Sequence, residues 1–273
     1  MAIITITRQL AALGDETAHE LAKLLGYRFV DKATLEERIK SLGVSGQNLK
    51  KYDERKPTFW DSLSQGRDDY LHHLKTAMYC EALEGNCILI GRGAGIIFEN
   101  VPGVLSVFLV SPLEIRVERV KSYFHCDDKR AKQILDQTDG DRIGFHRYFF
   151  DVDWNDPANY HLTLNTGSLH PAICAESIKQ IMSRSFTTET DTLHKQRLKE
   201  LTFGQQIKHH ILYEKNVAIH FLEASVSNDT VTLYGVANSQ ALIESALTAA
   251  RDMVSQDNVR SEIQMVQEYS IMP

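Results

Sequence analysis

The chain has 273 residues, of which 43% are hydrophobic and 24% are charged, and its formal net charge is -6. This composition supports one large domain or two ordinary ones, and it excludes a disordered chain. The acidic balance gives no sign of a broad surface for nucleic acid, and the longest apolar runs are too short to span a bilayer. The N-terminal residues enter a strand pattern without a signal segment. Four cysteines without paired spacing suit a reducing cytoplasm.

Residues 1–186 alternate short apolar strands with longer helical segments, a pattern typical of an α/β domain. Several strands are nearly continuous apolar runs, which indicates a parallel sheet with helices on both faces. In chain order we predict strands at 3–7, 28–30, 87–90, 105–110 and 162–165. A first helix is predicted to follow the loop after the first strand and to end at Gly26. Further helices are predicted at 33–40, at 63–83, over most of 112–150 and at 170–185. Residues 44–60 are predicted to form a charged insertion.

The rest of the chain has a different pattern. Residues 187–195 lack apolar periodicity and are predicted to form a linker. Residues 196–273 follow the order α-β-β-α-β, which predicts a small α+β domain with its helices on one face of a sheet. Its expected elements are a helix at 197–213, strands at 217–226 and 230–235, a helix at 239–253 and a strand at 259–266.

The loop between the first strand and the first helix is the strongest functional signal. A strand, a tight turn and a helix that begins at a glycine form a frame for phosphates, because the helix N-terminus presents unpaired backbone N–H groups. A complete phosphate-binding loop also has a lysine for the phosphates and a hydroxyl for magnesium. This loop retains one glycine, Gly14. The predicted nucleotide-binding residues are Arg8, Ala12, Leu13, Gly14, Asp15, Glu16 and Thr17.

Five separate stretches resemble, in order, the cytidylate kinase-like family of P-loop nucleoside monophosphate kinases. They are residues 3–9, 26–32, 90–94, 112–119 and 138–154. The family loop commonly has the sequence S-R-E-Y-G-S-G-G-R-E-I-A, whereas here Ala11 and Leu13 replace glycines and Asp15 replaces the arginine. The resemblance implies a five-stranded parallel sheet, ATP with Mg²⁺, and a nucleoside monophosphate as acceptor.

The resemblance also implies an acceptor site at Asp31, Lys32 and Arg92. Arg92 follows the third predicted strand between two glycines, and ligands bind at the carboxyl ends of strands in open α/β sheets. A surface turn is the alternative for Arg92. For Asp31 and Lys32 the alternative is a helix cap.

Four arginines match positions where the family contacts phosphates during catalysis. A guanidinium group suits this role because its planar fork holds two phosphate oxygens and stays charged. The alternative is a salt-bridged surface helix, since acidic residues lie nearby in the sequence. The predicted catalytic residues are Arg116, Arg119, Arg142 and Arg147. The adjacent histidine pairs diverge on a helix, so no side-chain metal site is predicted.

Residues 228–239 and the alanine-rich helix after them resemble a BON domain, which implies a module for sensing, assembly or self-association. Two functions therefore stay open for the whole chain. One is a kinase that transfers the γ-phosphoryl group of ATP to a nucleoside monophosphate, with CMP as the first candidate. The other is a catalytically inactive nucleotide-binding regulator, favoured by Ala11, Leu13, Asp15 and Glu16, because glycines are lost from the loop and carboxylates lie where phosphate should bind. A weaker third hypothesis is an interaction protein without a nucleotide.

Overall fold

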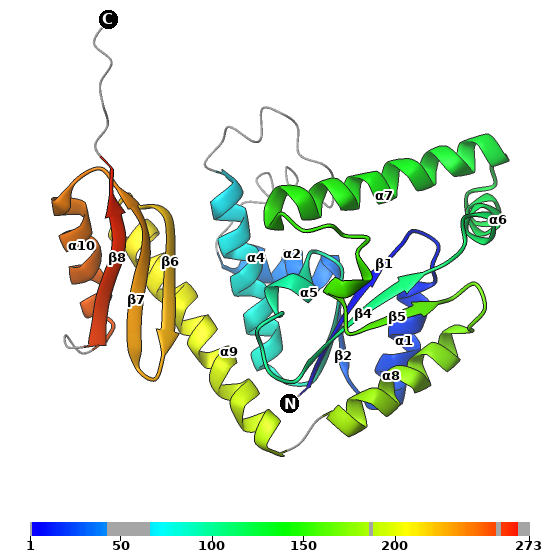
Figure 1. The fold of residues 1–273 in the computed structure, drawn as a ribbon, viewed down its shortest axis with the longest axis horizontal. Helices are drawn as coiled ribbons and strands as arrows, with labels where there is room; N and C mark the ends of the chain where they lie inside the picture. Colours follow the sequence, from blue (N-terminus) through cyan, green and yellow to red (C-terminus); the bar gives the residue numbers. More distant parts are fainter. Residues whose placement is uncertain (1, 43–65, 186–187, 255–257, 267–273) are drawn as a thin grey trace, which may run out of the picture. The chain divides into compact units, whose positions relative to one another are not determined.

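The computed structural model describes residues 2–42, 66–185, 188–254 and 258–266 (Figure 1). The chain divides into two compact units, Met1–Lys195 and Gln196–Pro273, which are treated separately below. The insertion predicted at 44–60 lies outside the described residues. Within the described ranges, no helix combines the length and the apolar character needed to cross a membrane.

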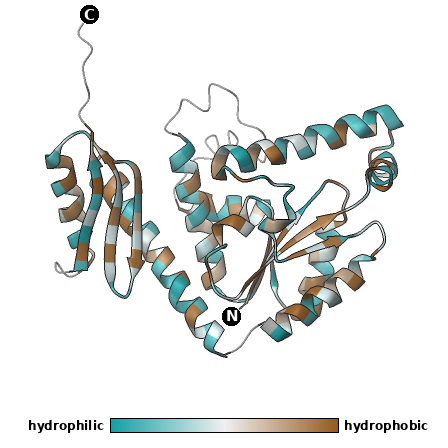
Figure 2. Cartoon of the chain, in the orientation of Figure 1, coloured by the Kyte–Doolittle hydropathy of each residue, from teal (hydrophilic) through white to brown (hydrophobic). Residues whose placement is uncertain are grey.

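A five-stranded parallel sheet organises the N-terminal unit and confirms the predicted fold class. The strand order is β2-β3-β1-β4-β5, and every neighbouring pair is parallel. Apolar residues are concentrated in the central strands (Figure 2), because helices cover both faces of the sheet. The strands are β1 (Ile3–Arg8), β2 (Arg28–Val30), β3 (Cys87–Ile90), β4 (Val104–Val110) and β5 (Leu162–Asn165).

Helices α1 (Gly14–Leu25) and α8 (Pro171–Ser185) pack on one face of this sheet, where Leu21 and Ile178 join a buried core with Ile4. On the opposite face lie α5 (Ala94–Ile97) and an aromatic cluster, in which Phe108 of β4 contacts Trp154 and Tyr160. The remaining helices of this unit are α2 (Lys32–Ser41), α4 (Gly66–Leu83), α6 (Leu113–Phe124), α7 (Asp128–Phe150) and the short 3-10 helix η3 (Pro157–Asn159).

The helical region predicted at 112–150 is two helices. Helix α6 ends where His125 adopts a left-handed conformation, with φ of 51°. Helix α7 then begins after Asp127, whose carboxylate accepts a hydrogen bond of 2.8 Å from the backbone N–H of Arg130. Such a cap satisfies one of the free N–H groups at the start of a helix, so the break is encoded locally.

The C-terminal unit has the predicted α-β-β-α-β order. Strands β6 (His220–Ser227) and β7 (Thr230–Ala237) form an antiparallel hairpin, and β8 (Val259–Met265) pairs with β7 in parallel. Its core contains residues of the strands, of α10 (Gln240–Arg251), of the end of α9 (Thr188–His209) and of the π-helical turn η4 (His210–Glu214).

The structure differs from the sequence prediction at the expected linker, 187–195. Residues from Thr188 onward belong to α9. Two features of this segment favour a helix although it has no apolar stripe. Glu189 and Asp191 lie in the first turn, where the helix dipole favours negative charge. Asp191 also pairs with Lys195 one turn later, with 2.6 Å between Oδ2 and Nζ.

Candidate functional site

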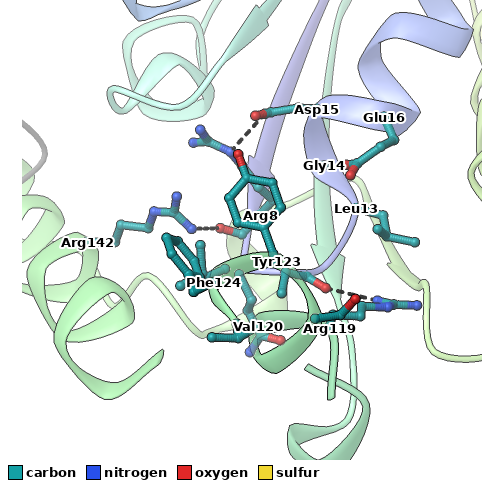
Figure 3. A pocket seen from close by; sticks show the side chains of 14 residues that line it. Arg8, Leu13, Gly14, Asp15, Glu16, Arg119, Val120, Tyr123, Phe124 and Arg142 are labelled. Atoms are coloured by element: carbon teal, nitrogen blue, oxygen red, sulfur yellow. Dashed lines mark hydrogen bonds and ion pairs between the residues drawn. The ribbon is translucent and has the colours of Figure 1, made fainter. Parts of the chain in front are cut away.

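A cavity of about 700 Å³ lies beside the loop after β1 and the N-terminus of α1 (Figure 3). Its walls come from the β1–α1 loop, the first turn of α1, the C-terminal half of α6, and α7. The lining residues are Arg8, Gln9, Leu10, Ala11, Leu13, Gly14, Asp15, Glu16, Arg119, Val120, Ser122, Tyr123, Phe124 and Arg142. The loop that the sequence selects is therefore one wall of a cavity.

Two predicted nucleotide-binding residues lie behind this wall. Ala12 and Thr17 are fully buried. The Thr17 hydroxyl donates a 2.7 Å hydrogen bond to the Leu13 carbonyl, and the Ala12 carbonyl accepts a 3.0 Å bond from the Thr166 hydroxyl. These two residues hold the loop in place, whereas Arg8, Leu13, Gly14, Asp15 and Glu16 reach the cavity.

The loop backbone keeps a conformation that suits glycine at the two positions where glycine is missing. Ala11 has φ of 59° and Leu13 has φ of 51°, both in the left-handed region. A residue with a Cβ atom pays roughly 1–2 kcal/mol for this conformation. The substitutions therefore leave the path of the loop intact and add strain and side-chain bulk to it.

Replacing Leu13 with glycine is expected to stabilise the N-terminal unit by about 0.5–1 kcal/mol, because relief of the left-handed strain exceeds the added entropy of the unfolded chain. Urea denaturation followed by tryptophan fluorescence can measure this, since both tryptophans precede residue 195. Ala12→Gly is the matched control: Ala12 is absent from the positive-φ residues, so glycine there should destabilise. If both variants lost the same free energy of unfolding, backbone strain at Leu13 would be contradicted.

Three of the four predicted catalytic arginines donate hydrogen bonds to the loop. Arg142 Nη1 lies 2.8 Å from the Arg8 carbonyl oxygen. Arg119 Nη1 lies 2.9 Å from the Ala11 carbonyl oxygen. Arg116 Nη1 is 3.5 Å from the Leu10 carbonyl oxygen. These arginines therefore fix the loop from the side of α6 and α7.

Asp139 completes this arrangement from α7. One carboxylate oxygen accepts a 2.9 Å hydrogen bond from the Leu10 N–H, and the other pairs with the Arg116 guanidinium. Arg116 is buried and does not line the cavity, while Arg147 is exposed and lies outside the lining. The structure therefore brings Arg119 and Arg142 to the cavity and leaves the other two predicted catalytic arginines out of it.

The cavity has mixed charge. Burial lowers the pKa of Arg119, and the Glu16 carboxylate acts in the opposite direction. Because an arginine pKa starts so high, the side chain stays a cation at neutral pH. Asp15 is exposed and lies 3.6 Å from Arg8, measured from Oδ1 to Nε. The two carboxylates of the first turn thus stand beside the cations that would attract a phosphate.

The predicted acceptor residues lie at the ends of the neighbouring strands β2 and β3, away from the cavity lining. Asp31 caps α2 and accepts two 2.9 Å hydrogen bonds from the N–H and the hydroxyl of Thr34. Burial alone would raise the pKa of Asp31, but these hydrogen bonds hold it below its ordinary value. Lys32 is exposed and lies 3.8 Å from Glu36.

Arg92 is buried, with φ of 56° between two glycines that also have positive φ. Its Nη1 donates a 2.7 Å hydrogen bond to the Tyr70 hydroxyl, and its Nη2 lies 3.2 Å from Glu36 Oε1. Glu36 is therefore shared by Arg92 and Lys32, which joins two of the three predicted acceptor residues into one group.

Sequence reasoning missed two aromatic residues at the cavity. Tyr123 and Phe124 end α6, and 79% and 49% of their surfaces are exposed. Figure 3 shows them in front of the loop. Two adjacent aromatic residues in a polar helix were the available signal, because large apolar side chains in water often mark a binding surface.

The residues at the cavity fit a nucleotide polyphosphate. Arg8, Arg119 and Arg142 supply positive charge beside the N-terminus of a 12-residue helix. Asp15 and Glu16 supply carboxylate oxygens, the donors that Mg²⁺ prefers. Across the described ranges, no group of three or more His, Cys, Asp or Glu side chains could hold a metal ion by itself. A magnesium ion bound there would therefore take its other ligands from phosphate oxygens and water.

One solved structure supports this fold. The chain is similar to an uncharacterised protein from Eubacterium ventriosum, with a TM-score of 0.53 and 18% identity over 67% of this chain and 99% of that one. It is also similar to a shikimate kinase from Acinetobacter baumannii, with a TM-score of 0.37 and 17% identity over 68% of this chain and 96% of that one.

Comparison of sequences identifies the family. A cytidylate kinase from Sulfolobus acidocaldarius is 31% identical over 102 residues, which are 37% of this chain and 55% of that relative's length. The BON domain model matches residues 202–267. The model of the cytidylate kinase-like family matches residues 3–168, more than half of the chain. The chain therefore belongs to the cytidylate kinase-like family and has a BON domain after its kinase-like domain.

Proposed function

We propose that the N-terminal unit binds ATP with its phosphates in the cavity beside α1 and transfers the γ-phosphoryl group to a nucleoside monophosphate. CMP is the first acceptor to test, because the similar relative is named a cytidylate kinase. One observation supports the proposal most strongly. Three arginines, from β1, α6 and α7, line one cavity at a helix N-terminus.

The proposed roles follow from position. Arg119 and Arg142 would contact phosphate oxygens, because each lines the cavity and is anchored to the loop. Arg116 would hold the loop in place. Asp31, Lys32 and Arg92 would bind the acceptor at the ends of β2 and β3. We assign Arg147 no role, since it is exposed outside the cavity lining. Mg²⁺ bound with the nucleotide would neutralise charge on the β- and γ-phosphates.

A catalytically inactive nucleotide-binding regulator is the second candidate. Two observations favour it. The Asp15 carboxylate lies at the cavity beside Arg8, and the loop arginines already donate to backbone carbonyls. In that case the N-terminal unit would bind a nucleotide without turning it over. The BON domain would then act as a sensing or assembly module that responds to the bound nucleotide.

Thermal unfolding with a ligand panel tests both candidates. The panel contains ATP, ADP, CMP, dCMP and other monophosphates, each with and without Mg²⁺. A ligand at 100 times its Kd should add about 2.7 kcal/mol to the free energy of unfolding. Shifts with ATP and one monophosphate, together with ADP formation, would support the kinase. A shift with ATP and no ADP formation would support the regulator. No shift with any nucleotide would contradict both.

We also propose a cytoplasmic location and assembly through the BON domain. The four cysteines are free thiols, which suits a reducing compartment. Light scattering of the purified chain, with and without nucleotide, would show self-association or a change in it.

A further inference from the structure

The β1–α1 loop has no lysine, although a complete phosphate-binding loop uses one to contact the phosphates. Arg8 is the last residue of β1, and Gly14 is the first residue of α1. These two residues are in direct contact. We propose that Arg8 supplies the missing phosphate-binding cation by passing its side chain over Gly14. The inference rests on the proposed nucleotide site.

The contact at Gly14 is steric. A Cβ atom on Gly14 would lie 2.4 Å from Arg8 Cγ, 2.7 Å from Arg8 Cβ and 3.2 Å from Arg8 Cδ. The stem of the arginine therefore occupies the space where a side chain of residue 14 would begin. Gly14 is absent from the residues with positive φ, so its backbone does not need glycine. Glycine is needed here because any side chain would displace Arg8.

This route brings the Arg8 guanidinium to the cavity wall. Its Nε lies 3.6 Å from Asp15 Oδ1, and Figure 3 shows this ion pair beside Gly14. The Arg8 side chain is 18% exposed, whereas that of Asp15 is 65% exposed. The cation is therefore held by packing, and the carboxylate is the freer partner. A phosphate oxygen can replace a carboxylate oxygen at a guanidinium group, because both are anionic acceptors of the same kind.

The backbone of Arg8 is fixed by a second cation of the same cavity, since its carbonyl oxygen accepts the 2.8 Å hydrogen bond from Arg142. Arg8 is thus positioned at both ends, by Gly14 along the stem and by Arg142 at the main chain. An arginine held in this way loses little freedom when it binds phosphate, which favours affinity.

Calorimetric titration of the full chain tests the proposal with two probes, ATP and inorganic tripolyphosphate. Arg8→Ala and Gly14→Ala should each weaken binding of both probes about tenfold, the loss expected for one charge-assisted contact. Arg8→Lys should retain most of the affinity, because it keeps the charge and most of the stem. Gly140→Ala is the matched control: a Cβ on Gly140 in α7 would meet nothing within 4 Å. The Gly140→Ala variant should bind both probes with the affinity of the wild type.

The outcomes separate this inference from the proposed function. If the wild type binds the probes and Arg8→Ala binds them with the same affinity, the inference is overturned but the proposed nucleotide site is not. Unchanged affinity in Gly14→Ala would overturn the steric route. No binding of either probe by the wild type would overturn the site and the inference together. If Gly14→Ala melts early without ligand, Arg8→Ala and Arg8→Lys still decide the question.

Discussion

Arg119→Ala is expected to lower the free energy of unfolding of the N-terminal unit by about 3 kcal/mol and to remove ATP binding. Arg119 joins two segments that are far apart in the sequence. Its Nη1 donates to the Ala11 carbonyl at 2.9 Å, and its Nη2 donates to the Thr166 carbonyl at 2.8 Å. Hydrogen bonds from charged groups contribute about 1.5–3 kcal/mol each, and truncation leaves both carbonyls without this donor.

Urea denaturation followed by tryptophan fluorescence would measure the loss, and a thermal shift with ATP would measure binding. Arg130→Ala is the control, because Arg130 is an exposed arginine of α7 and its removal changes the net charge equally. The free energy of unfolding of that variant should differ from the wild-type value by less than about 0.5 kcal/mol. Equal stability of the Arg119 and Arg130 variants would mean that the two hydrogen bonds of Arg119 do not hold the loop.

Asp15→Arg is expected to tighten ATP binding by about five- to thirtyfold, or roughly 1–2 kcal/mol. The substitution removes a carboxylate from the cavity wall and adds a guanidinium group at the position where the family has arginine. Asp15 is exposed in the first turn of α1, so the new side chain has room.

Calorimetry at two salt concentrations would measure this gain, since charge contacts weaken with ionic strength. Asp15→Asn should give a smaller gain, because it removes the repulsion without adding a cation. Glu176→Arg makes the same charge change on an exposed residue of α8 and should leave the affinity unchanged. Weaker or unaltered binding by Asp15→Arg, with normal behaviour of the control, would contradict a phosphate site at α1.

Much of the fold could be predicted because its signals are local. The β-branched and apolar runs predict all five strands of the parallel sheet, and Gly26 ends α1 in the left-handed conformation that favours glycine. No helix was predicted for the segment 188–195, because its charged residues favour a helix through the dipole and through pairs one turn apart, without an apolar stripe. The two helices within 112–150 could have been separated by attention to the capping residue Asp127.

The sequence by itself determined the family, the parallel sheet, and the position of the altered loop between β1 and α1. Those features depend on periodicity and on residues close together in the chain. The tertiary structure alone decided what the arginines contact. Arg119 and Arg142 reach loop carbonyls more than 100 residues away, and Arg8 crosses a glycine six positions later. Such contacts depend on how α6 and α7 pack beside the loop, and no local pattern records that packing.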